Sequence, residues 1–130
     1  MRALPSKDDI SEFIGATFQS VWALELLCFL RQKEGQSLSR AEMVAGLRGS
    51  ELVISQSVDS LVRAGLVVSD ADGAARYAPA NAQLAEFAGE VEALYARSPD
   101  AVRRLIVSTA SPGLAAFVDA FRIRREKDDG

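Results

Sequence analysis

Histidine is absent from this chain of 130 residues. Without imidazole the sequence lacks the commonest metal ligand and the side chain best suited to proton transfer near neutral pH. The acidic residues are scattered over the polar faces of expected helices and over turns, where solvation explains them. Neither a G-x-G-x-x-G nor a G-x-x-x-x-G-K-[ST] spacing is present to hold a phosphate. We therefore expect no enzyme activity, no metal and no cofactor.

Cysteine occurs once, at Cys28, so a disulfide within one chain is excluded. Its neighbours are leucines and a phenylalanine, which favours a small buried hydrophobic side chain over a reactive thiol. Long apolar runs are also missing: VWALELLCFL at 21–30 is interrupted by Glu25 and is shorter than the roughly 20 residues that cross a bilayer. The start, MRALPSKDDISEF, has no apolar run after its basic residue. We expect no membrane span and a cytoplasmic location.

The composition is that of a folded protein: 48% of the residues are hydrophobic, 25% are charged and the net charge is −3. A chain of this length buries roughly two thirds of its unfolded surface around one core. The sequence contains no internal repeat, no low-complexity tract and no long linker. It therefore predicts a single domain over residues 1–130.

The N-terminal part, residues 1–34, has the pattern of one long helix. Ser6 and Asp9 have the spacing of a capping box, and apolar residues recur every three or four positions from Ile10 to Leu30. Basic residues followed by Gly35 mark the end, after about six turns. Trp22 shares a face with Phe18 and Leu26 and is expected in the core.

The middle part, residues 35–79, has a helix-turn-helix pattern followed by a hairpin. Ser39 and Glu42 form a capping box for RAEMVAGLR, and after a glycine turn ELVISQSVDSLVRAG continues to Gly65. Two short strands, 66–68 and 75–79, flank the Asp-Gly hairpin signal at 72–73. We expect this hairpin to form a wing, packed on the helices and on a third short strand near 36–38.

The C-terminal part, residues 80–130, returns to helical periodicity. One apolar stripe follows Asn81, a second helix begins at Ser98-Pro99-Asp100, and Ser111-Pro112-Gly113 precedes a third segment, LAAFVDAFRIRRE. The predicted fold is mainly α with a small β-hairpin wing. It is a winged helix-turn-helix with a long N-terminal helix and two to three C-terminal helices.

The stretch EMVAGLRGSELVISQSVDSLVRAGLVVSDADGAARYAP resembles a winged helix-turn-helix. Within it, VDSLVRAGLVV is similar to the end of the recognition helix and the first wing strand of bacterial transcription regulators of the multiple-antibiotic-resistance (MarR) type. The resemblance implies a homodimer that binds double-stranded DNA, with one helix in the major groove and the wing near the backbone. The residues that it implies face DNA are Ser55, Gln56, Ser57, Ser60, Arg63 and Arg76.

The charge of this region favours a second hypothesis. Residues 35–79 contain four cations and five acids, a net charge of 4 − 5 = −1, whereas DNA-binding faces normally carry a basic patch. Regulators of this type usually have arginine or lysine at positions that match Gln56, Ser60 and the wing tip, where this chain has polar residues and Asp70 and Asp72. The alternative is a winged-helix protein-protein interaction module with little or no DNA affinity.

Two further possibilities stay open from the sequence. The C-terminal arginines, from Arg97 to Arg125, could form a patch on folding, but residues 80–130 hold seven cations against eight acids. We expect them to cap helix ends and to pair with nearby acids. A regulator could also sense a small molecule in a pocket lined by Trp22, Phe18 and Tyr95, a pattern that the sequence does not separate from an ordinary core.

Overall fold

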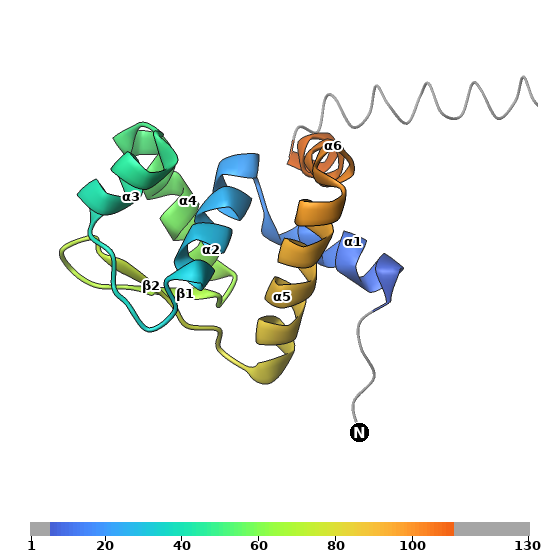
Figure 1. The fold of residues 1–130 in the computed structure, drawn as a ribbon, viewed down its shortest axis with the longest axis horizontal. Coiled ribbons are helices and arrows are strands. Elements are labelled where there is room, and N and C mark those ends of the chain that lie inside the picture. The colour runs from blue at the N-terminus through green and yellow to red at the C-terminus, as the bar shows by residue number, and fades with distance from the viewer. Residues whose placement is uncertain (1–5, 111–130) are drawn as a thin grey trace, which may run out of the picture.

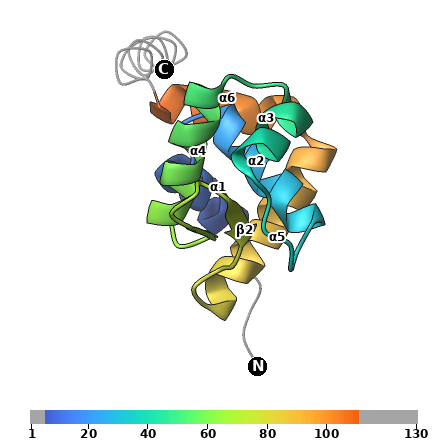
Figure 2. The ribbon, with the colours of Figure 1, turned by 90° about the vertical axis from the view of Figure 1, so that its left-hand side faces the viewer.

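The structure, a computed structural model, describes residues 6–110. This part of the chain is mainly helical, with one small antiparallel hairpin (Figures 1 and 2). In chain order the elements are α1 (Lys7–Thr17), α2 (Val21–Gln32), α3 (Arg40–Leu47), α4 (Glu51–Arg63), β1 (Val67–Ser69), β2 (Ala75–Tyr77), α5 (Ala82–Arg97) and α6 (Pro99–Ala110). The third C-terminal helix predicted at 114–126 lies outside the described residues.

The prediction of one long N-terminal helix was wrong, because α1 and α2 are separate helices bent by 108°. Phe18 ends α1 in an extended conformation, and Ser20 begins α2 by accepting a hydrogen bond from the Ala23 amide at 3.2 Å. The apolar spacing of three and four in the sequence continues across this corner, because Phe18 at the corner is itself buried in the core. The capping box of Ser6 and Asp9 was predicted correctly.

The core forms around α2, where four of the six buried side chains are leucine. The largest side chains with less than 2% exposure are Phe18, Ile14, Leu24, Leu26, Leu27, Leu30, Met43, Ile54, Leu61, Leu66, Ile106 and Val58. Cys28 is also buried, as expected. Burial, assisted by the nearby carboxylates of Glu92 and Glu25, raises the pKa of its thiol to about 12. The thiol therefore stays protonated at neutral pH.

The helix-turn-helix segment matches its predicted boundaries because local capping groups define them. Ser39 and Glu42 form the expected capping box at the start of α3, and Ser50 caps α4. The left-handed residue of the turn is Arg48, with φ 56°, rather than a glycine. Gly49 has a different role, since a Cβ there would lie 3.1 Å from Cζ3 of Trp22.

Trp22 lies at the surface rather than in the core, contrary to the sequence prediction. It is 38% exposed, and its ring packs against Gly49 in the turn between α3 and α4. The break between α1 and α2 explains the difference, because Trp22 is in the first turn of a new helix whose inner face is formed by Ala23, Leu24 and Leu27. The indole thus covers the helix turn from outside.

The hairpin pairs Val67 with Tyr77 and Ser69 with Ala75, as the sequence indicated. A third strand is represented by a single bridge, in which Leu38 and Ala75 exchange two backbone hydrogen bonds of 2.9 Å. The loop between β1 and β2 is ordered by the carboxylate of Asp70, which accepts from the amides of Asp72 and Ala74 at 2.9 and 3.1 Å. The hairpin loop is therefore held by its own acidic side chain.

Side chains of α2 and α3 hold this hairpin against the helices. Arg40 at the start of α3 donates from Nε to the Gly73 carbonyl at 3.2 Å. Arg31 on α2 lies 5.6 Å from the ring centre of Tyr77 on β2, and the same guanidinium pairs with Glu92 on α5. One arginine therefore joins the hairpin to the C-terminal helices.

The two helices predicted after the hairpin are confirmed. Asn81 caps α5 by accepting from the Leu84 amide at 2.8 Å, and α6 packs against both α5 and α1. Among the residues described, no single helix is long and apolar enough to cross a membrane. By length and composition the bent pair of α1 and α2 meets that test together, and its inner face is part of the core.

Candidate functional site

The outer face of α4 is the surface that the sequence assigns to DNA. The inner side of the helix is buried through Ile54, Val58 and Leu61, which leaves the opposite side exposed beside the hairpin (Figure 2). The exposed residues on this face are Glu51, Leu52, Gln56, Asp59, Val62 and Arg63, and Ser55 is half-buried at its edge. We call this surface the α4 face.

Of the six predicted contact residues, three are exposed, two are buried and Ser55 is half-buried. Gln56 and Arg63 lie on the α4 face, and Arg76 is exposed in the middle of β2. Ser57 and Ser60 are only 3% and 8% exposed, because the helical period turns them inward. These two hydroxyl groups are therefore much less accessible to a duplex on the α4 face than the side chains of Gln56 and Arg63.

The corner between α1 and α2 adds two polar residues that the sequence prediction missed. Gln19 and Ser20 line a hollow of about 350 Å³ together with Gln56, Asp59 and Arg63 of α4, and the two buried serines form part of its wall. We call it the α4 hollow. In the sequence, the polar pair Gln19-Ser20 is the sign of the corner. The prediction missed it because the apolar residues on both sides of the pair keep the spacing of three and four.

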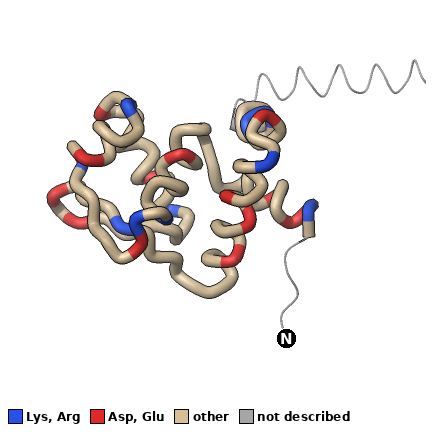
Figure 3. Tube along the Cα trace, viewed as in Figure 1, with Lys and Arg blue, Asp and Glu red and all other residues tan. Residues whose placement is uncertain are grey.

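The electrostatic character of the region is mixed rather than basic. Arg63, Arg76 and Arg48 are exposed, whereas the Arg40 guanidinium is bonded to the hairpin loop. Acidic and basic positions are interspersed over this part of the molecule, and Asp70 and Asp72 make the hairpin loop acidic (Figure 3). The Asp70 carboxylate accepts hydrogen bonds from two amides of the loop, so its negative charge is fixed at this position of the hairpin.

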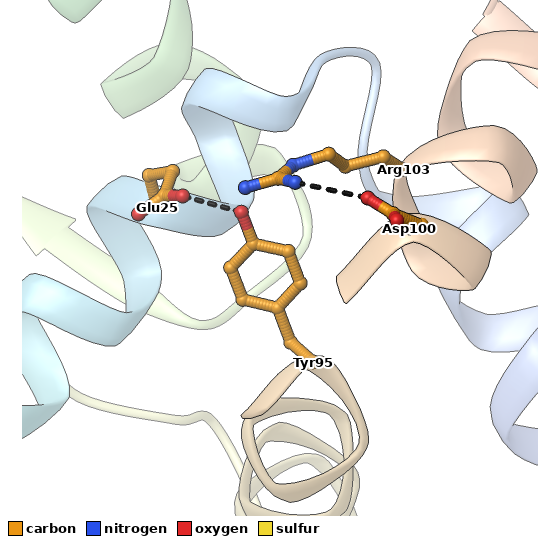
Figure 4. Close-up of polar contacts among 4 residues, drawn as sticks. All are labelled: Glu25, Tyr95, Asp100 and Arg103. Carbon is orange, nitrogen blue, oxygen red and sulfur yellow. Dashed lines mark hydrogen bonds and ion pairs between the residues drawn. The ribbon is translucent and has the colours of Figure 1, made fainter. Parts of the chain in front are cut away.

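A second polar cluster joins α2, α5 and α6 (Figure 4). The hydroxyl of Tyr95 donates to Glu25, and the guanidinium of Arg103 lies 5.5 Å from the ring centre of Tyr95 and 3.3 Å from the Asp100 carboxylate. Burial, followed by the bond to Glu25, raises the pKa of Tyr95, and the Tyr95 hydroxyl raises the pKa of Arg103. The cluster links three helices through one phenol.

A cavity of about 290 Å³ borders this cluster. Its lining combines Glu25 and Arg103 with Val21, Trp22 and Leu47, so it lies between α2, the end of α3 and α6. Of the three aromatic residues expected to form a ligand pocket, Trp22 lines the cavity and Phe18 is in the core. Tyr95 contacts the pocket residue Glu25 instead. Since Glu25 and Arg103 both have protein partners, the cluster primarily connects helices.

Replacing Tyr95 by phenylalanine is expected to lower the free energy of unfolding by about 1 kcal/mol, because the half-buried Glu25 loses a donor. Urea denaturation followed by circular dichroism measures the change. The matched control is the same substitution in a Glu25→Ala background, where the loss should largely disappear. An equal loss in both backgrounds would assign the effect to packing and not to the hydrogen bond.

Within residues 6–110, no group of three or more cysteine or carboxylate side chains is placed to hold a metal ion. The α4 face with its hollow and the cluster around Tyr95 are thus considered as sites for other kinds of partner. Comparison with known proteins adds no assignment: no protein-family model matches the chain, and no curated protein and no solved structure is significantly similar to it.

Proposed function

We propose that the chain is a DNA-binding transcription regulator of the winged-helix type, acting as a homodimer through the α4 face and the hairpin. The observation that carries the proposal is the order of elements: α2, the bridging residue Leu38, α3, α4 and the β1–β2 hairpin. This order is typical of a winged helix, in which the helix before the hairpin enters the major groove. The relation to MarR-type regulators remains a prediction.

The dimensions and side chains of α4 support this use. Its 13 residues span about 20 Å, and a major groove about 12 Å wide admits one helix. Gln56 in the middle of the α4 face has the amide that pairs with adenine, and Arg63 near its end can reach phosphate or guanine. Arg76 on β2 would contact the backbone beside the groove.

We expect a dimer because each copy offers few cations to the phosphates of DNA. One copy offers Arg63 and Arg76 at the proposed interface, and a second half-site doubles these contacts at a high effective concentration. We expect α1 and the C-terminal helices to form the dimer interface. Val107 on α6 is 44% exposed, which places a large apolar side chain on this side of the molecule.

The test is a fluorescence anisotropy titration of a labelled random 30-base-pair duplex with the full chain, at low salt and at several higher salt concentrations. We expect binding whose logarithm falls linearly with the logarithm of salt concentration. Four phosphate contacts in a dimer give a slope of about −4. No binding at low salt and tens of micromolar protein would overturn the proposal.

A protein-protein interaction module is the second candidate, and a specific observation favours it. Leu52 and Val62 on the α4 face are 66% and 41% exposed, next to Glu51 and Asp59. Large apolar side chains beside acids are suited to a protein partner and not to phosphate. If this candidate is right, Leu52→Ser abolishes capture of a partner, whereas Gln56→Ala has no effect on function in the cell.

A further inference from the structure

A groove runs along the outer side of α1, away from the polar cluster around Tyr95. Two hollows of about 280 and 370 Å³ form it, and they share Phe13 and Ala16 in their linings. The complete lining is Asp9, Glu12, Phe13, Ala16, Thr17, Gln19, Ser60, Arg63, Ala64, Leu84 and Phe87. We call it the α1 groove.

The floor of the α1 groove is aromatic and apolar. The rings of Phe13 on α1 and Phe87 on α5 stack with centroids 4.7 Å apart and planes 13° apart. Both side chains are only half-buried, so apolar ring surface remains open to solvent. Covering this surface would gain the free energy of hydrophobic burial.

The charge of the groove is unequal along its length. Asp9 and Glu12 are exposed at one end, beside Asp8 in the first turns of α1. Such a surface, apolar along its floor and acidic at one end, fits a segment that has an apolar stripe followed by basic residues.

Residues 114–126, which lie outside the described part of the chain, have this pattern in sequence. In LAAFVDAFRIRRE the apolar residues Leu114, Phe117, Val118 and Phe121 have the spacing of one helical stripe. Arg122, Arg124 and Arg125 come at its end, so residues 114–126 carry three cations against two acids, Asp119 and Glu126. The pattern is complementary to the groove in both polarity and charge.

The connection between α6 and this segment is short. The described chain ends at Ala110 of α6, and α6 packs directly against α1. An extended chain covers about 13 Å between Ala110 and Leu114. The segment therefore starts close to the helix that carries the groove, at a high effective concentration.

We propose that residues 114–126 bind the α1 groove of their own chain. The apolar stripe covers the stacked rings of Phe13 and Phe87, and the arginines lie beside Asp9 and Glu12. The argument for this contact rests on the groove and on the sequence of the C-terminal segment. Because Arg63 of α4 is part of the groove lining, a bound segment would lie beside this proposed DNA-contact residue.

The test is a photocrosslink in the full chain. Gln19, exposed at the rim of the groove, is replaced by p-benzoylphenylalanine, and the products are mapped by mass spectrometry after irradiation. We expect crosslinks to residues 114–126, within one chain, as shown by mixing isotopically light and heavy protein. Crosslinks that join two chains, or none to this segment, would overturn the proposal. The same probe at Ala45, exposed on α3, should give no such crosslink.

Two further variants test the chemistry of the contact with the same readout. Glu12→Arg reverses charge at the acidic end and is expected to reduce the crosslink yield several-fold, whereas Glu34→Arg, exposed after α2, should leave the yield unchanged. Phe121→Ser removes the largest residue at the end of the stripe and should reduce the yield as strongly. A yield that neither Glu12→Arg nor Phe121→Ser reduces would contradict the proposed contact.

Discussion

Replacing Phe18 by alanine is expected to lower the free energy of unfolding by about 3–5 kcal/mol, the largest stability effect that we predict. Phe18 is 1% exposed, fills the corner between α1 and α2, and meets Phe13 edge-to-face at 6.1 Å. Alanine would leave a cavity at the point where the two helices diverge, so α1 would lose part of its packing against the core. Urea denaturation, followed by the helical signal in circular dichroism, measures the loss.

The adjacent residue provides the control. Gln19 is exposed in the same corner, and Gln19→Ala should change the free energy of unfolding by less than about 0.5 kcal/mol. If Phe18→Ala prevents folding, Phe18→Leu keeps most of the volume and should cost about 1 kcal/mol. A loss below 1 kcal/mol for Phe18→Ala would show that the corner contributes little to the stability of the folded chain.

Reversing the charge of Arg63 is expected to weaken DNA binding more than tenfold at low salt, if the proposed function is correct. Arg63→Glu removes a cation from the α4 face of each copy, where Glu51 and Asp59 already repel phosphate. Two lost phosphate contacts reduce the salt slope by about 2 in the dimer. The converse change, Asp59→Lys, should strengthen binding by a similar factor. Anisotropy titrations against the random duplex measure both.

The matched control is Arg97→Glu, which makes the same change of charge at the exposed end of α5. At about 0.1 M salt it should have a much smaller effect on affinity than Arg63→Glu, because charge is then screened within about 10 Å. Equal losses for Arg63→Glu and Arg97→Glu would show that net charge, not the α4 face, controls binding. Unchanged binding in Arg63→Glu would remove α4 as the interface.

The sequence predicted the elements whose ends are fixed by local hydrogen bonds. The capping box of Ser39 and Glu42 fixes the start of α3. The pair Asp72-Gly73 lies in the hairpin loop, where Gly73 has a positive φ and the Asp72 amide donates to the Asp70 carboxylate. The bridging residue Leu38 was also located, since a two-stranded hairpin needs a further partner.

The corner at Phe18 could not be predicted in this way. A helix break is usually marked by a polar or glycine interruption of the apolar pattern, but here a buried aromatic residue continues the pattern through the break. The corner also bears on the candidate site, since it places Gln19 and Ser20 in the same hollow as Ser57 and Ser60 of α4. The two serines themselves are buried because they share the side of α4 that carries Ile54, Val58 and Leu61, which the helical period of the sequence already indicates.

Arg31 of α2 contacts both the hairpin and the C-terminal helix α5. Its guanidinium pairs with Glu92 on α5 and lies over the Tyr77 ring on β2, while its backbone belongs to the rigid central helix α2. A displacement of α5 along α2 must therefore either break the ion pair or carry the guanidinium away from the hairpin. Loss of the Arg31 side chain would therefore remove a contact of the hairpin and a contact of α5 at the same time.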